Sequence, residues 1–189
     1  KISGLVLMGI GEPLDNYDNV LKFLSLLSHK DGNNFSLRHV SLSTCGLVPK
    51  IYELAELKLG LTLCISLHSS DNSSRSEIMP VNRTYNIEAL IEACKHYISA
   101  TGRRITFEYA VMDNVNSAER DADRLAELLR GINCHVNLIP VNKVKERKLE
   151  LNIPISKYDK YECGMIGEML SSITTTAGIL EAKITSCNP

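Results

Sequence analysis

The sequence predicts an α/β fold built on a parallel sheet. Apolar, β-branched runs of strand length alternate with segments of helical periodicity, which is typical of parallel strands joined by right-handed crossover helices. Several runs end in small or polar residues, as in "MGIGEP", "LSTCG", "SLHSS" and "LIPVN". Such residues at many strand ends favour a barrel or partial barrel, with loops around one site, over an open doubly wound sheet.

The individual elements follow from this periodicity. Five strands are predicted, over Ile2–Met8, His39–Ser43, Leu61–Leu67, Arg104–Met112 and His135–Pro140. Helices are predicted between them, over 16–30, 48–60, 86–102 and 117–131. The last three helical segments end at glycine, which favours a left-handed C-cap. Asn86, with Glu88 in the first turn, is the expected N-cap of the third helix.

The C-terminal part is less regular. "SKYDKYECGMIGEMLSSI" is predicted to be helical despite Gly164 and Gly167, and "ILEAKITSC" is predicted to be a closing strand. We therefore expect a partial barrel over residues 1–148 and a C-terminal helix and strand over 149–189.

Composition narrows the class of protein. A chain of 189 residues with 44% hydrophobic and 23% charged residues is typical of one soluble globular domain. No apolar run reaches the roughly 18 residues of a membrane helix, and no signal peptide opens the sequence, so we expect a cytoplasmic protein without a membrane partner. The net charge of −1 gives no global basic field. Nucleic-acid binding would need local patches such as Arg103–Arg104 or 143–148, which alone are typical of solvated surface.

The cysteines do not have the spacing of a metal site. There are six of them, Cys45, Cys64, Cys94, Cys134, Cys163 and Cys187. No pair has CxxC-type spacing, so no metal ligand is assigned and a reducing compartment is expected. Cys64, Cys94 and Cys134 lie in apolar or amphipathic runs and are expected to be small buried hydrophobes.

Polar residues at the strand ends form a candidate binding site for a small molecule. Glu12 lies in the glycine-containing loop "MGIGEPLDN", where a carboxylate would repel a phosphate and suits an ammonium group. Ser43, Ser66 and His68 offer neutral hydrogen bonds, and Asn142 can both donate and accept. Alone, a serine there more often forms a turn and a histidine is more often structural. Together they favour a zwitterionic or hydroxyl-bearing ligand.

Two further features leave alternatives open. Arg75 and Arg83 in "RSEIMPVNRTYN" are predicted on a loop, where two arginines can clamp an RNA phosphate; the alternative is that Arg75 pairs with a nearby carboxylate such as Asp71 or Glu77. Glu108 interrupts an apolar strand, and it either faces a barrel lumen or lies on the solvent face of an edge strand.

Five segments in register resemble a known family. They are "LMGIGEPLDNYDNV", "LSTCGLVPKI", "CISLHSSDNSSRSEIMPVNRTYNIEAL", "RRITFEYAVMDNVN" and "CHVNLIPVN". In order and spacing they are similar to the RlmN-like radical SAM RNA methyltransferases, which methylate carbon 2 of adenine in large-subunit ribosomal RNA and transfer RNA. The similarity runs from Leu5 to about Arg147.

The resemblance implies a partial (β/α)6 radical SAM barrel that binds S-adenosylmethionine and a [4Fe–4S] cluster. By matching motifs, Gly11 and Glu12 would hold the methionine amino end of the cofactor. The rest of its site would be lined by Ser43, Ser66, Leu67, His68 and Asn142. The loop from Arg75 to Arg83 and the basic run after Asn142 would face the RNA.

The sequence also departs from the family. The CxxxCxxC motif that binds the cluster is absent, so we expect a fragment of a longer parent protein, inactive by itself. Cys187 falls where the family has the cysteine that accepts the methyl group, although Asn188 replaces the glycine after it. Cys187 is therefore the candidate catalytic residue, and an inert terminal thiol is the alternative.

The function implied for the parent protein is methylation of adenine carbon 2 through a methylcysteine intermediate, with ribosomal and transfer RNA as substrates. An electron donor such as flavodoxin is the implied partner. Two alternatives stay open: a relative acting on adenine carbon 8, and a non-catalytic remnant that binds S-adenosylmethionine or RNA.

Overall fold

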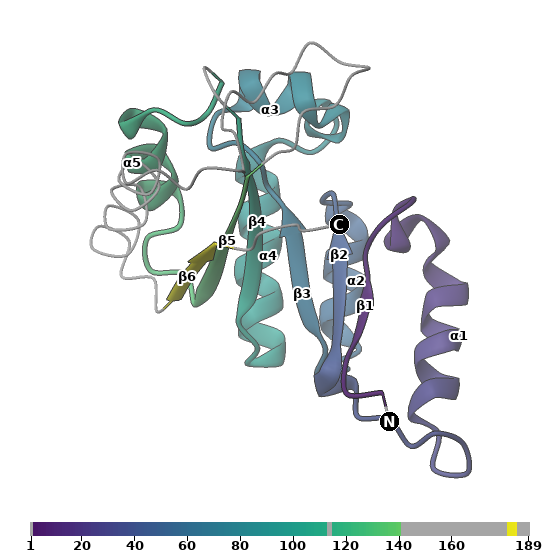
Figure 1. The fold of residues 1–189 in the computed structure, drawn as a ribbon. Helices are drawn as coiled ribbons and strands as arrows, with labels where there is room; N and C mark the ends of the chain where they lie inside the picture. The colour runs from purple at the N-terminus through teal and green to yellow at the C-terminus, as the bar shows by residue number, and fades with distance from the viewer. Residues whose placement is uncertain (1, 113–114, 141–180, 185–189) are drawn as a thin grey trace. The chain divides into compact units, whose positions relative to one another are not determined.

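The computed structural model describes residues 2–112, 115–140 and 181–184. The chain divides into two compact units, Lys1–Ser66 with Val81–Thr106 (unit 1) and Leu67–Pro80 with Phe107–Pro189 (unit 2). Strands alternate with helical segments along the described chain, as the sequence predicts, with one additional helix between the third and fourth strands (Figure 1).

Unit 1 contains three parallel strands. They are β1 (Leu5–Leu7), β2 (Val40–Thr44) and β3 (Thr62–Ser66), in that spatial order. Leu42 is in register with Leu7 on one side and Leu63 on the other, which gives one apolar face. Successive side chains alternate between the faces, so Ser43 and Ser66 lie on the opposite face. The register therefore places two predicted site serines on the same side of the sheet.

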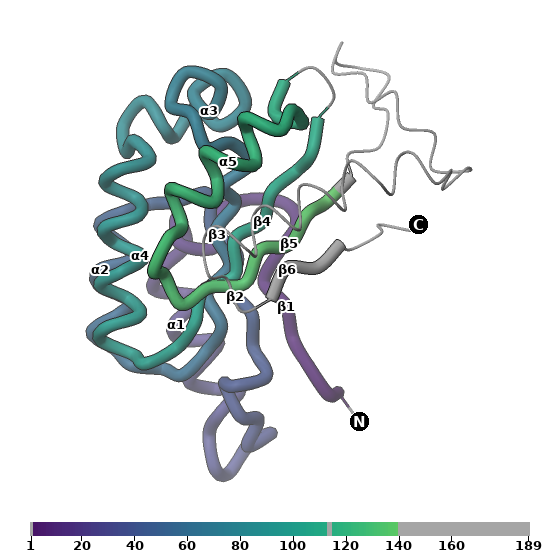
Figure 2. The backbone as a smooth tube through the Cα atoms, turned by 90° about the vertical axis from the view of Figure 1, so that its left-hand side faces the viewer, coloured from purple at the N-terminus to yellow at the C-terminus, as the bar shows by residue number. Residues whose placement is uncertain are grey.

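Helices cover the apolar side of these strands. Unit 1 contains α1 (Tyr17–Ser28), α2 (Val48–Glu56), α4 (Ile87–Thr101) and the 3₁₀ turns η1 (Pro13–Asn16), η2 (Leu37–His39) and most of η3 (Pro80–Arg83). Figure 2 shows α1, α2 and α4 on one side of β1–β3. Ile51 of α2 and Leu90 of α4 are fully buried, and the Tyr97 hydroxyl donates to the Leu61 carbonyl at 3.3 Å. The helices therefore pack on the apolar face of these strands (Figure 2), and Ser43 and Ser66 lie on the opposite face.

The predicted helix caps are confirmed in part. Asn86 Oδ1 accepts from the Ala89 N–H at 3.0 Å, which makes Asn86 the N-cap of α4 as expected. Gly102 is the left-handed C-cap of the same helix, with φ 65°. The other two glycine caps were wrong, because α2 ends at Glu56 and is capped by Leu57, and the later α5 is capped by Leu129.

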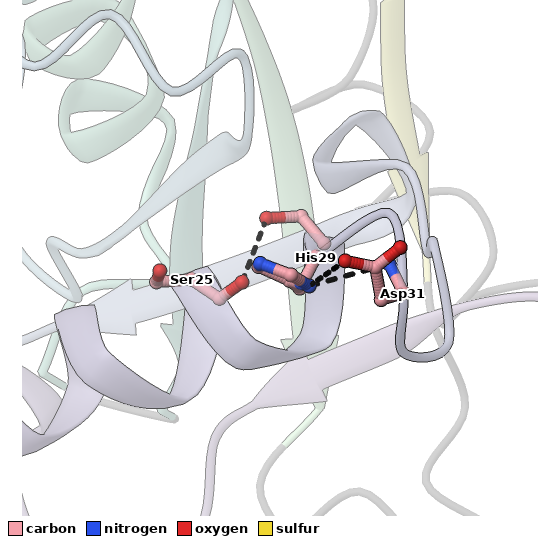
Figure 3. A network of polar contacts seen from close by, with 4 residues as sticks. Ser25, His29 and Asp31 are labelled. Carbon is pink, nitrogen blue, oxygen red and sulfur yellow. Dashed lines mark hydrogen bonds and ion pairs between the residues drawn. The ribbon is translucent and has the colours of Figure 1, made fainter.

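The end of α1 has a local polar network (Figure 3). The Asp31 N–H donates to Nδ1 of His29 at 3.2 Å, and the Asp31 carboxylate lies 3.9 Å from the same nitrogen. Both side chains are more than half exposed. This contact is a surface turn, and such exposed pairs contribute little to stability.

Unit 2 contains the later strands. They are β4 (Ile105–Val111, in this unit from Phe107), β5 (Cys134–Pro140) and β6 (Glu181–Ile184), with helices α3 (Asn72–Ile78) and α5 (Glu119–Leu128). β5 and β6 are parallel, with His135 opposite Glu181, so the predicted closing strand is confirmed. Phe107, Tyr109 and Leu125 are fully buried and form part of the core. Helix α3 was not predicted.

Three sequence-based expectations concern the chain as a whole. Cys64, Cys94 and Cys134 are buried, as expected. In the described part of the chain, no helix is long and apolar enough to cross a membrane. The boundary predicted between 148 and 149 lies outside the described residues and stays a prediction.

Candidate functional site

A small cavity in unit 1 brings four predicted site residues together. It has a volume of about 130 Å³, and its lining includes Gly11, Glu12, Ser43 and Ser66. A second, larger cavity of about 540 Å³ shares the loop from Met8 to Pro13. Ser43 is 7% exposed and Ser66 is half-buried, so the hydroxyl groups line a recess rather than open surface.

The loop after β1 adopts a conformation that requires glycine. Gly9 and Gly11 have φ values of 137° and 93°, which L side chains rarely adopt. A Cβ at either position would meet no atom within 4 Å. Glycine is therefore required here by the backbone conformation, because a Cβ would not collide with other atoms. The turn that results brings Glu12 to the cavity.

Glu12 links two strand ends. Its Oε1 accepts from the Leu14 N–H at 2.9 Å, which caps η1, and its Oε2 accepts from the Cys45 N–H at 2.7 Å. The sequence predicted only a ligand-binding role for Glu12 and gave no indication of these two backbone hydrogen bonds. A carboxylate has about four lone-pair positions, so two backbone bonds leave acceptor capacity for a ligand cation.

Leu67 and His68 form a bend in unit 2. Their N–H groups donate to the Glu108 carbonyl at 3.0 and 3.2 Å. His68 has a φ of 57°, in the left-handed region that few non-glycine residues adopt. Its Nδ1 accepts from the Ala110 N–H at 3.0 Å, so the ring proton is on Nε2.

The His68 ring is neutral at physiological pH. Burial, helped by the nearby charge of Arg75, lowers the pKa of His68 from 6.5 to about 4. A neutral ring with Nδ1 already used as an acceptor can offer one N–H donor, Nε2–H, to a ligand.

The structure corrects the interpretation of Arg75. This residue lies on helix α3, not on a loop, and its side chain is completely buried. Its Nε donates to the Leu67 carbonyl at 3.0 Å. The proposal that Arg75 faces RNA is therefore wrong, whereas Arg83 is exposed. Sequence reasoning failed here because α3 carries only one apolar residue, Ile78.

Glu108 is also buried and lies next to this bend. It is 5% exposed, which excludes the solvent-face alternative. Its Oε2 accepts from Asn137 Nδ2 of β5 at 2.6 Å. Burial raises the pKa of Glu108, and the hydrogen bond from Asn137 opposes that rise. Neither side chain was assigned to a site from the sequence.

Two predicted site residues, Asn142 and Cys187, lie outside the described residues. Within the described part of the chain, no group of three His, Cys, Asp or Glu side chains could hold a metal ion.

Comparisons with known proteins agree on one family. A family model described as the radical SAM superfamily matches residues 2–129. The chain is 57% identical over 146 residues to a probable dual-specificity RNA methyltransferase RlmN of Clostridium beijerinckii, covering 77% of the chain and 41% of that protein. It is 53% identical over 150 residues to the protein of the same name in Clostridioides difficile, covering 79% of the chain and 44% of that protein. The chain thus spans less than half the length of these curated relatives.

Two solved structures have a fold similar to that of this chain. A radical SAM methyltransferase from Sphaerobacter thermophilus matches with a TM-score of 0.89 and 36% identity, over 100% of this chain and 52% of that one. A domain of a pyruvate-formate lyase-activating enzyme from Bacteroides vulgatus matches with a TM-score of 0.64 over 97% of this chain and 99% of that one. The second likeness, at 16% identity, concerns the fold alone.

Proposed function

The chain belongs to the radical SAM superfamily, and we propose that it binds S-adenosylmethionine and serves the methylation of RNA. The names of its relatives support the activity, since they are RNA methyltransferases and a radical SAM methyltransferase. Because the chain covers less than half of the RlmN relatives, the activity proposed is that of a longer protein.

The observation that carries the proposal is the cavity around Glu12. The methionine part of the cofactor has an ammonium group, which needs an anionic acceptor, and a carboxylate, which needs neutral or positive donors. Glu12 supplies the acceptor, and the Ser43 and Ser66 hydroxyls supply donors within the same recess. The positive φ of Gly11 makes the turn that brings Glu12 to this recess. The residues present therefore fit this cofactor.

Leu67 and His68 are proposed as further ligands of the cofactor from their motif, which follows Ser66 in the sequence. The neutral His68 ring offers its Nε2–H to an acceptor atom. Asn142 is proposed as a further ligand from its motif alone. When bound, S-adenosylmethionine supplies the methyl group and, on reductive cleavage, a radical.

The described residues do not fit the iron–sulfur cluster of the superfamily, since no cysteine group suited to a metal occurs among them. We infer that the cluster ligands belong to the longer protein. The electron donor, such as flavodoxin, is proposed for that protein too.

We propose adenine carbon 2 of ribosomal and transfer RNA as the target, because the motifs resemble the RlmN-like family and the relatives carry the RlmN name. Adenine carbon 8 is the alternative. Cys187 is proposed as the methyl carrier from its position in the sequence. A cytoplasmic location fits an RNA substrate.

The test is a calorimetric titration of the chain with S-adenosylmethionine. Glu12→Gln keeps the size of the side chain but removes its charge and one of its two backbone acceptors, so binding is expected to weaken about tenfold or more, and circular dichroism checks that the variant is folded. Glu53→Gln is the matched control, because Glu53 is an exposed residue of α2 paired with Lys50. Equal affinity of the unaltered chain and Glu12→Gln would remove Glu12 from the site. No binding by the unaltered chain would overturn the proposal.

A further inference from the structure

The bend at Leu67 and His68 is held from both sides by unit 2. Both of its N–H groups donate to the Glu108 carbonyl. Its two carbonyls accept from side chains, the Leu67 carbonyl from Arg75 and the His68 carbonyl from Asn116 Nδ2 at 2.7 Å. All four backbone polar groups of the bend are therefore used, and its conformation is fixed by more distant residues.

Asn116 makes the most connections in this network. Its side chain is 2% exposed, and Nδ2 donates to both the His68 and the Ala110 carbonyls at 2.7 Å. Its Oδ1 accepts from the Met112 N–H at 2.6 Å. Both donor hydrogens and the acceptor of the amide are thus satisfied, which is the geometry of a side chain fixed in one orientation.

Ala110 completes the link between Asn116 and the imidazole. Its carbonyl accepts from Asn116, and its N–H donates to His68 Nδ1 at 3.0 Å. Asn116 therefore holds His68 in two ways, directly at the carbonyl and through Ala110 at the ring. A non-glycine residue rarely adopts a left-handed φ, and these hydrogen bonds hold His68 in that conformation.

We propose that Asn116 is a positioning residue for S-adenosylmethionine binding. It holds the left-handed bend at His68 and thereby keeps the ring with its Nε2–H as the free donor. This inference rests on the proposed function, in which the His68 ring is a ligand of the cofactor. Asn116 makes no contact with the cofactor in this account and acts only through His68 and Ala110.

The test uses Asn116→Asp, which keeps the size of the side chain and the acceptor for Met112. A carboxylate oxygen then replaces Nδ2 and faces two carbonyl oxygens, so both donated bonds are lost. Asn133→Asp is the matched control, because Asn133 is an exposed asparagine of the same unit. Affinity for S-adenosylmethionine is expected to fall about tenfold in Asn116→Asp and to be unchanged in the control.

Nitrogen-15 NMR of the His68 ring gives a readout independent of the cofactor. At pH 7 the unaltered chain should show one tautomer, protonated at Nε2, and Asn116→Asp should show a mixture. If Asn116→Asp does not fold, Asn116→Gln, which retains the amide, is used with both readouts and should show a smaller loss. For whichever variant folds, unchanged affinity or an unchanged His68 spectrum would overturn the inference.

The two proposals fail differently. If the unaltered chain binds the cofactor and Asn116→Asp binds it equally well, the positioning role is wrong and the proposed function stands. If the unaltered chain does not bind, the proposed function is wrong and the inference falls with it.

Discussion

The carboxylate of Glu12 accepts a 2.7 Å hydrogen bond at Oε2 from the backbone N–H of Cys45, so the loop after β1 is fixed to the end of β2. The other oxygen of the same carboxylate holds the Leu14 N–H. One side chain thus shapes the cavity wall and provides its negative charge. Structural and ligand-binding effects of a mutation at this position must therefore be measured separately.

Glu12→Ala is expected to lower the free energy of unfolding by about 1–3 kcal/mol, since two backbone N–H groups lose their acceptor. Urea unfolding monitored by circular dichroism measures the change. Glu53→Ala, which removes an exposed ion pair with Lys50, should cost less than about 1 kcal/mol. Similar losses of unfolding free energy in both variants would show that the two Glu12 hydrogen bonds stabilise the fold no more than an exposed ion pair does.

Gly11→Ala is expected to destabilise the chain by about 1–2 kcal/mol, because an L residue is strained at φ 93° although space for a Cβ exists. Gly4→Ala is the control, since its Cβ would lie at an ordinary 3.7 Å from the His39 carbonyl oxygen. The measurement is again urea unfolding. A loss at Gly4 as large as at Gly11 would contradict the conformational explanation.

Arg75→Ala is expected to lower the free energy of unfolding by about 2–4 kcal/mol, because it leaves a buried gap and the Leu67 carbonyl without this donor. Arg83→Ala, at an exposed position, should change it by about 0.5 kcal/mol or less. Thermal unfolding of both variants measures these changes. Equal stability of the two variants would contradict the burial of the Arg75 side chain.

The lowered pKa of His68 predicts a pH-dependent stability. The folded state holds the ring neutral down to a pKa of about 4, whereas the unfolded chain is protonated below about 6.5. The contribution of His68 is therefore fully present above pH 6.5 and is lost as the pH falls through 4, by about 3 kcal/mol in total.

His68→Asn removes this titration while keeping a residue that tolerates the left-handed region. The difference in unfolding free energy between the unaltered chain and His68→Asn, measured from pH 7 to pH 4.5, cancels the contributions of the other acids. That difference should shrink as the pH falls. A pH-independent difference would mean that the His68 pKa is not lowered.

Much of the fold was predictable because hydrophobic periodicity is a local signal. The runs that became β2 to β5 and the helical spacing of α4 needed no long-range information. The α/β partial radical SAM barrel inferred from motif resemblance is confirmed by the family match and by a solved structure at a TM-score of 0.89.

The parts that were missed depend on contacts distant in sequence. Asn116 in "DNVN" has the composition of an ordinary turn, and nothing local shows that its amide reaches the His68 carbonyl. The burial of Arg75 depends likewise on tertiary packing around a short polar helix. Four residues predicted to bind the cofactor nevertheless line one cavity, because the ends of parallel strands meet at one edge of the sheet.

The most direct test of the account compares S-adenosylmethionine with 5′-methylthioadenosine, which lacks the amino-acid end, by calorimetry on the unaltered chain and on Glu12→Gln. If Glu12 holds the ammonium group, the unaltered chain should prefer S-adenosylmethionine by about tenfold or more, and Glu12→Gln should lose most of that preference. The same preference in both proteins would contradict the central claim that this cavity binds the amino-acid end of the cofactor.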